Sequence, residues 1–369
     1  MARAGLGDKW KCLFANDFDK KKADVYKDNW GQDEILVDDV WHIPLDLLRG
    51  TADLAWASFP CQDLSLAGTQ AGLEGKRSGA FWGFWKHMLA LSREGRQPSL
   101  VVLENVYGTL TSNQGRDFVA LLDALRAGGY NAGALVIDAV HFVPQSRPRL
   151  FIIAVRQDLV VPSRLTMDGP YPLWTPSALS AVLKAANFTD RKDWISWNLG
   201  HPQVRQTVFA DLIDDNPEGV SWHSPAETLR LLAMMTVNNR EKVRTAQLSG
   251  IKVVGTVYKR TRPGKDGIRS QRAEIRFDDI AGCLRTPSGG SSRQSIMIVE
   301  GKNIRSRLLA PREAARLMGL PEEYRLPLNY NDAYHLAGDG VVVPVVRHLA
   351  EYLLEPILRA QVRESVGAA

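Results

Sequence analysis

The first 155 residues alternate short apolar runs with stretches in which apolar side chains recur every three or four positions. The short runs predict strands, and the helical spacing predicts helices between them. Strands and helices that alternate in this way favour an α/β fold with a doubly wound, mostly parallel sheet. The predicted strands cover residues 10–15, 35–40, 53–59, 99–103, 134–140 and 150–155, and the predicted helices cover residues 20–29, 79–93 and 115–127.

Four of the predicted strands lead directly into a residue with acid or nucleophile chemistry: Asp17, Asp39, Cys61 and Glu104. Ligands of open α/β sheets bind at the carboxyl ends of the strands. We therefore expect these four side chains to lie along one edge of the sheet.

Regular patterning weakens between residues 160 and 290 and returns after residue 304. Residues 311–318 begin with proline and stop before Gly319, which predicts a helix. Residues 341–354 predict a buried helix that follows Gly338-Asp339-Gly340.

Positive charge is concentrated in residues 240–276, which hold eleven Lys or Arg and three acids. The net charge of this segment, +8, exceeds the +5 of the whole chain. Such a concentration indicates either a partner that is a polyanion or a solvated loop surface.

Composition narrows the class of protein. A chain of 369 residues that is 45% hydrophobic and 24% charged is typical of a globular protein. No apolar run approaches the ~20 residues that a membrane span needs, and residues 1–8 lack the apolar core of a signal peptide. Three distant cysteines, Cys12, Cys61 and Cys283, exclude a disulfide framework and indicate a reducing, cytoplasmic compartment.

Three short motifs carry candidate chemistry. Cys61 follows Pro60 at a strand end, Glu104 ends the next predicted strand, and Gln145, Arg147 and Arg149 alternate along an extended segment. Taken singly, each has an ordinary structural reading: an inert small thiol, a turn carboxylate and solvated arginines. Taken together, they describe a nucleophile, an acid and a row of donors in one cleft.

The order of these motifs resembles that of the cytosine-5 DNA methyltransferase family. The resemblance rests on Pro60-Cys61-Gln62, Glu104-Asn105-Val106 and Gln145-x-Arg147-x-Arg149, and it extends to residues 285–290, 311–319 and 338–344. It spans residues 5–160 and 280–355 and leaves the basic segment unmatched.

The resemblance implies a class I methyltransferase fold that uses S-adenosylmethionine, with a catalytic domain of residues 1–165 plus 335–369. Residues 166–334 are expected to form a smaller target-recognition domain. The target is a cytosine flipped out of duplex DNA. The implied roles are attack on carbon 6 by Cys61, a hydrogen bond to the ring nitrogen from Glu104, a contact to the base carbonyl from Arg149, and organisation of Cys61 and Glu104 by Arg147.

Cofactor and DNA contacts also follow from the resemblance. Asp17 is expected to bind the ribose hydroxyls, Phe18 to lie beside the adenine, and Asp39 with Val40 to contact the adenine edge. Asp339 stands where the family often has Asn. The remaining implied cofactor contacts are Pro60, Asp339 and Gly340, and the implied DNA contacts are Gln62, Ser65, Gln145, Arg260, Arg262, Arg272 and Arg285.

The beginning of the chain departs from the family, because its first strand and glycine-rich loop are not found before residue 5. Two expectations follow: translation starts upstream, or the chain as written binds cofactor poorly and is unstable. Titration calorimetry with S-adenosylmethionine tests this.

Two other functions remain open, a tRNA cytosine-5 methyltransferase and a catalytically silent DNA-binding relic. We further expect a monomer of bacterial or phage origin, acting beside a cognate restriction endonuclease.

Overall fold

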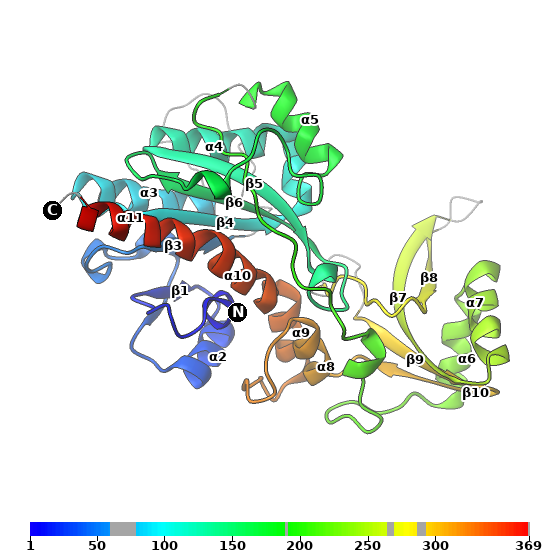
Figure 1. Cartoon of the computed structure of the whole chain (residues 1–369). Helices are drawn as coiled ribbons and strands as arrows, with labels where there is room; N and C mark the ends of the chain where they lie inside the picture. The colour runs from blue at the N-terminus through cyan, green and yellow to red at the C-terminus, as the bar shows by residue number, and fades with distance from the viewer. Residues whose placement is uncertain (60–78, 189–190, 264–268, 286–292, 368–369) are drawn as a thin grey trace.

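The computed structural model describes residues 1–59, 79–188, 191–263, 269–285 and 293–367. Its larger sheet has the strand order β3 (Leu54–Ser58), β4 (Leu100–Val106), β6 (Pro148–Arg156), β5 (Tyr130–Asp138). β3 and β4 are parallel, and β6 runs antiparallel to both β4 and β5. Three of these four strands therefore run in one direction, which confirms the α/β prediction with one reversed strand (Figure 1).

Both faces of the larger sheet are covered, because its strands are apolar on both sides. On one face, Val101, Leu103 and Ile152 pack with α3 (Ala80–Arg93), α4 (Arg116–Ala127) and α5 (Ser177–Ala185). On the other, Leu100, Val102 and Ile153 join a core that includes α10 (Val343–Leu349). The doubly wound arrangement is confirmed.

The N-terminal segment forms a second, two-stranded parallel sheet from β1 (Ala15–Asp17) and β2 (Ile35–Val37), joined by α2 (Lys20–Trp30). Before it, α1 (Ala2–Leu6) packs on α10. The strand predicted at residues 10–15 lies later, because only Ala15 of that run pairs with a neighbour. The strand predicted at 35–40 is shorter, because Asp39 caps a turn by accepting a hydrogen bond from the Trp41 amide.

Glu104 lies inside β4, where the prediction had the strand stopping at residue 103. Pairing continues to Val106 because Glu104 is opposite Ser58 on β3 and Phe151 on β6. A strand paired on both sides positions the side chain more firmly than a loop does.

The smaller sheet is antiparallel, with the order β10 (Asn303–Leu308), β9 (Ser295–Glu300), β7 (Lys252–Pro263), β8 (Arg269–Arg276). One face packs Val257, Ile275 and Met297 against α6 (Pro225–Ala233) and α7 (Val237–Leu248). The opposite face carries Val254 and Ile298 into the core of the larger sheet. Figure 1 shows this body beside the larger sheet, with α6 and α7 on its far side.

The packing differs from the expected domain of residues 166–334. Trp174, Trp197 and Phe209 are buried with the larger sheet, and a Cβ at Gly133 of β5 would meet the Ile195 carbonyl oxygen, so the two backbones touch. The helices α8 (Pro311–Leu317) and α9 (Tyr330–Asp339) also belong to that core. The separate apolar core of the smaller sheet involves residues 231–304 alone.

The predicted helix at residues 341–354 is observed as α10 followed by a π-helical turn, Ala350–Leu354, and then α11 (Glu355–Gly367). Within the described part of the chain, no helix has both the length and the apolarity needed to cross a bilayer.

Candidate active site

An ion pair joins the ends of β4 and β6. Arg149 Nε lies 3.3 Å from Glu104 Oε1, and the two side chains are 15% and 8% exposed. Glu104 is the fifth residue of β4, and Arg149 is the second residue of the antiparallel β6 beside it, so strand pairing itself brings them together.

Burial raises the pKa of Glu104, while the positive charge of Arg149, hydrogen bonding from Ser58 and the charge of Arg147 act in the opposite direction. A carboxyl group with a raised pKa keeps its proton at higher pH and can donate it to a bound base. The sheet therefore holds a candidate acid beside a permanently charged donor.

The chain that leads toward Cys61 is fastened next to Glu104. Asn105 Nδ2 donates to the Phe59 carbonyl oxygen at 3.1 Å, and Asn105 Oδ1 accepts from the Val106 amide and the Thr109 hydroxyl. Phe59 is therefore held by the residue that follows Glu104. The predicted site residues Pro60, Cys61, Gln62 and Ser65 lie outside the described residues, and their roles stay predictions.

Gln145 is fully buried, and its amide is used by backbone groups. Its Nε2 donates to the Leu317 carbonyl oxygen at 2.8 Å, and its Oε1 accepts from the Leu284 amide at 3.1 Å. This placement does not agree with the expected contact to DNA. Gln145 instead connects α8 to the segment that enters the smaller sheet.

Arg147 is also buried, and its hydrogen bonds differ from those expected. Its guanidinium donates to the Cys283 sulfur and to the carbonyl oxygens of Leu284, Gly338 and Gly340. It acts on Glu104 only through its charge. Burial, and secondarily Arg149, lowers the pKa of Arg147 to about 10.

The first half of the predicted cofactor site lies at one end of the β1–β2 sheet. Parallel pairing aligns Asp17 with Val37, so Asp17 and Phe18 emerge at the same end as Asp39 and Val40. Asn16 fastens this end by donating from Nδ2 to the Asp38 carbonyl oxygen at 2.8 Å. The two acids therefore lie at one sheet end. That sheet is separate from the one that carries Glu104, so the expected single edge with Asp17, Asp39 and Glu104 is not observed, and Cys61 lies outside the described residues.

The chemistry of this end suits a nucleoside. Phe18 is 73% exposed, and burial raises the pKa of the neighbouring Asp17. An exposed aromatic face stacks on a base, and a carboxylate accepts hydrogen bonds from ribose hydroxyls. The backbone at Val40 is held in place by α3, because the Val40 carbonyl oxygen lies 2.7 Å from Nε2 of His87 on that helix.

The second half of that site is the last turn of α9 together with its C-cap, Gly338 to Gly340. The Asp339 carboxylate is 2.7 Å from Lys22 Nζ, and Lys22 lies on α2 just beyond Asp17. The Met1 side chain fills the space that a Cβ on Gly340 would take. The turn and Asp17 are thus neighbours. Their closeness also shows in the pKa of Asp17, which the charge of Lys22 lowers and the charge of Asp339 raises.

Three described arginines of the basic segment, Arg260, Arg272 and Arg276, lie on the face of the β7–β8 pair opposite α6 and α7. Register places Arg260 directly across from Arg272, and Tyr258 across from Glu274. We call the side chains of Tyr258, Arg260, Arg272 and Arg276 the basic face. Tyr258 packs against Gly282, and the Arg260 guanidinium lies 4.9 Å from the Tyr258 ring centre and 3.6 Å from Glu274.

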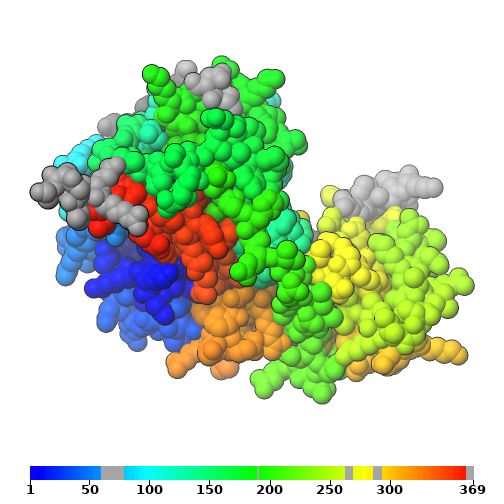
Figure 2. All heavy atoms as spheres, in the orientation of Figure 1, coloured from blue at the N-terminus to red at the C-terminus, as the bar shows by residue number. Residues whose placement is uncertain are grey.

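The basic face shares its side of the sheet with Val254 and Ile298, which pack toward the larger sheet. It therefore borders the hollow that Figure 2 shows between the two bodies. Arg285 is exposed, and the Arg262 side chain lies outside the described part of the structure.

Comparison with known proteins identifies the family of the chain. Residues 1–355 match the family described as C-5 cytosine-specific DNA methylase. The chain belongs to that family. Curated relatives include the type II methyltransferases M.Bsp6I of Bacillus sp. (strain RFL6), 25% identical over 95% of this chain and 93% of that protein, and M.HhaI of Haemophilus parahaemolyticus, 25% identical over 92% and 86%.

Solved structures agree on the fold of this methylase. A Spodoptera frugiperda DNMT2 variant superposes with a TM-score of 0.57 at 16% identity, covering 94% of this chain and 93% of that one. A putative DNA modification methyltransferase encoded by an Escherichia coli prophage gives 0.55 at 16% identity, over 97% and 95%. At this identity the likeness shows the class I methyltransferase fold alone.

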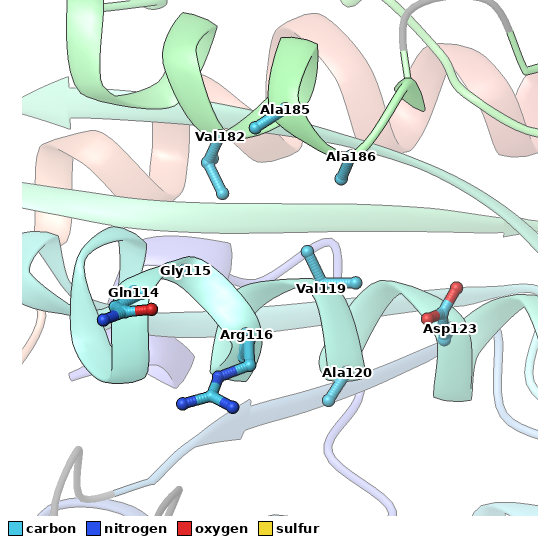
Figure 3. Close-up of a pocket in the computed structure, with 9 residues that line it drawn as sticks. All are labelled: Gln114, Gly115, Arg116, Val119, Ala120, Asp123, Val182, Ala185 and Ala186. Atoms are coloured by element: carbon cyan, nitrogen blue, oxygen red, sulfur yellow. The ribbon is translucent and has the colours of Figure 1, made fainter.

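An open groove of about 400 Å³ lies between α4 and α5 of this methylase, and none of the described residues predicted for the site lines it. It is lined largely by small apolar side chains, among them Val119, Val182 and Ala186 (Figure 3). No acid, base and nucleophile of the predicted set lines it, so it is not the candidate active site.

Sequence reasoning missed Tyr258, Lys22 and Cys283. Lys22 carries a signal in hindsight, since it lies five residues after Asp17 on the following helix. Tyr258 also carries one, since it is two residues before Arg260 on an extended segment and so shares its face. Cys283 carries none, because only the fold brings it to Arg147.

Proposed function

We propose that this methylase transfers a methyl group to carbon 5 of a cytosine flipped out of duplex DNA, through a covalent bond between Cys61 and carbon 6. The observation that carries the proposal is the buried Glu104–Arg149 pair, with Phe59 held beside it two residues before Cys61. A buried acid and a fixed guanidinium side by side match the ring nitrogen, amine and carbonyl along one edge of cytosine.

Cys61 adds to carbon 6 as a thiolate, and the electron pair of the ring double bond moves toward carbon 5. Glu104 gives its proton to ring nitrogen 3, so negative charge does not accumulate on the ring during attack. Arg149 donates to the base carbonyl. After carbon 5 has taken the methyl group, the carbon 5 proton passes to water and the Cys61 sulfur departs. The nitrogen 3 proton then returns to Glu104, which restores both the ring and the acid.

The residues at the β1–β2 end fit S-adenosylmethionine, which supplies an electrophilic methyl group when bound. Asp17 would accept hydrogen bonds from its ribose hydroxyls, Phe18 would stack on its adenine, and Asp39 with Val40 would contact the edge of that ring. Gly340 and Asp339 border the methionine end, where Lys22 and the side chain of Met1 lie.

The basic face holds the DNA. Arg260 and Arg272 oppose each other across a strand pair, and two like charges in this position repel. A phosphate between them removes that repulsion, so the smaller sheet is proposed as the part that recognises the target. We propose that the enzyme acts as a monomer beside a cognate endonuclease.

Parallel assays of tritiated methyl transfer onto duplex DNA and onto tRNA test the proposal, with mass spectrometry of the product nucleoside. We expect 5-methyldeoxycytidine from DNA and no transfer to tRNA. Transfer to tRNA alone would establish the other substrate, and transfer to neither would favour the silent DNA-binding alternative.

A further inference from the structure

The guanidinium of Arg147 bridges two segments that are far apart in sequence. Arg147 is 1% exposed. Its Nη1 donates to the Cys283 sulfur at 3.3 Å and the Leu284 carbonyl oxygen at 2.8 Å. Its Nη2 donates to the carbonyl oxygens of Gly338 and Gly340, at 2.6 and 2.7 Å.

One of these segments leads to the basic face. Cys283 and Leu284 follow Gly282, against which the Tyr258 ring packs, and Arg260 lies over that ring. The same segment is anchored to the catalytic body by the Ser146 amide, which donates to the Ala281 carbonyl oxygen. A shift of the smaller sheet therefore moves the acceptors of Nη1.

The other segment leads to the candidate cofactor site. Gly338 and Gly340 flank Asp339, whose carboxylate pairs with Lys22, and Lys22 follows Asp17 on α2. Whatever orders this turn fixes the acceptors of Nη2.

The bridge depends on the shape of the arginine fork. All four acceptors are neutral, and their hydrogen bonds compensate the cost of burying the charge. The fork is planar and rigid, and a lysine ammonium at the same position reaches one pair of acceptors but not both. Displacement of either segment consequently costs hydrogen bonds at the other.

We propose that Arg147 is a positioning residue that couples cofactor binding at the Gly338–Gly340 turn to DNA binding on the basic face. This inference rests on the proposed function. Because coupling between two binding sites is reciprocal, S-adenosylhomocysteine tightens DNA binding by the same factor by which DNA tightens S-adenosylhomocysteine binding.

Calorimetry of the full chain tests the inference. The target duplex is first identified by bisulfite sequencing of DNA methylated by the enzyme, and the Kd of S-adenosylhomocysteine is then measured with and without saturating duplex. For the unaltered enzyme we expect the duplex to lower this Kd by a factor of about 5 to 150. In Arg147→Lys we expect a factor below about 2.

Arg307→Lys is the matched control. Arg307 is equally buried and also spans from the smaller sheet to α8, through Glu313, but it makes no bond to the Gly338–Gly340 turn. Arg307→Lys removes a buried guanidinium of the same kind, and we expect it to keep the coupling between cofactor binding and DNA binding.

Retained coupling in Arg147→Lys, or no coupling in the unaltered enzyme, would overturn the inference while leaving the proposed function intact. Failure of the unaltered enzyme to bind S-adenosylhomocysteine at all would overturn both. If Arg147→Lys does not fold, hydrogen exchange of the unaltered enzyme decides. S-adenosylhomocysteine alone slows exchange in residues 281–285, and unchanged exchange there refutes the bridge.

Discussion

The end of the β4–β6 pair and the basic face both rely on arginine, but they hold it in opposite ways. Arg149 is 15% exposed and faces a carboxylate fixed by strands on both sides. Arg260 is 43% exposed, lies 3.6 Å from Glu274, and has another arginine directly across the strand pair. Buried charges interact strongly and are costly to separate, whereas exposed pairs contribute only ~0–1 kcal/mol.

The difference indicates a division of labour. A rigid, desolvated pair suits chemistry on one base, because donors that are already in place need no reorganisation during reaction. A solvated face with unbalanced positive charge suits a long polyanion, whose attraction depends on salt. Changes at the first region should affect rate, and changes at the second should affect affinity.

The largest effect is expected from Glu104→Gln, which keeps the shape of the side chain and removes its acid. The methyl-transfer rate at saturating DNA should fall by about 10²–10⁴-fold, because the proton for ring nitrogen 3 is lost. Single-turnover transfer of a tritiated methyl group measures this, with exposed Glu300→Gln as the control. A rate within tenfold of the unaltered enzyme, a bound set by the ~10²-fold minimum for such catalysis, would refute the acid role.

A smaller effect, on affinity alone, is expected from the double variant Arg260→Ala/Arg272→Ala. Each lost phosphate contact should reduce the slope of log K against log salt by about 1, and affinity at low salt should fall about tenfold. Binding measured by fluorescence anisotropy over a salt series tests this, and Arg244→Ala on the exposed side of α7 is the control. An unchanged salt slope would remove the basic face from the DNA interface.

The smallest effect is expected on the pH profile of Arg149→Gln. The reaction needs protonated Glu104, so the rate falls as pH rises through the pKa of this group. The charge of Arg149 acts to lower that pKa, and its removal should move the alkaline limb to higher pH, by about one unit. A limb that moves to lower pH, or not at all, would show that another group titrates.

The sequence predicted the sheet well because apolar runs and helical spacing are local signals. β3, α3 and α4 lie within one residue of their expected bounds. The shortened β2 escaped prediction because Asp39 forms a cap only where its side chain meets the Trp41 amide. Glu104 was expected after its strand because the pattern does not reveal that β6 continues alongside it.

The site itself was only partly predictable. Motif order brought Glu104 and Arg149 together correctly, as the ion pair shows. The burial of Gln145 and Arg147 could not be predicted from the sequence. Alternation in an extended segment indicates which side chains share a face, but not which other segments cover that face. Their partners, Leu284, Leu317 and Gly338, come from segments more than 130 residues away.

The most direct test of the account is a covalent trap. A duplex with 5-fluorocytosine at the target position, incubated with the enzyme and S-adenosylmethionine, should give a complex that survives denaturing electrophoresis. Release of the Cys61 sulfur requires removal of a proton from carbon 5, and the fluorine in its place cannot be removed by a base. Cys61→Ala should give no such complex. An adduct that persists in Cys61→Ala, or none from the unaltered enzyme while it methylates ordinary cytosine, would contradict attack by Cys61.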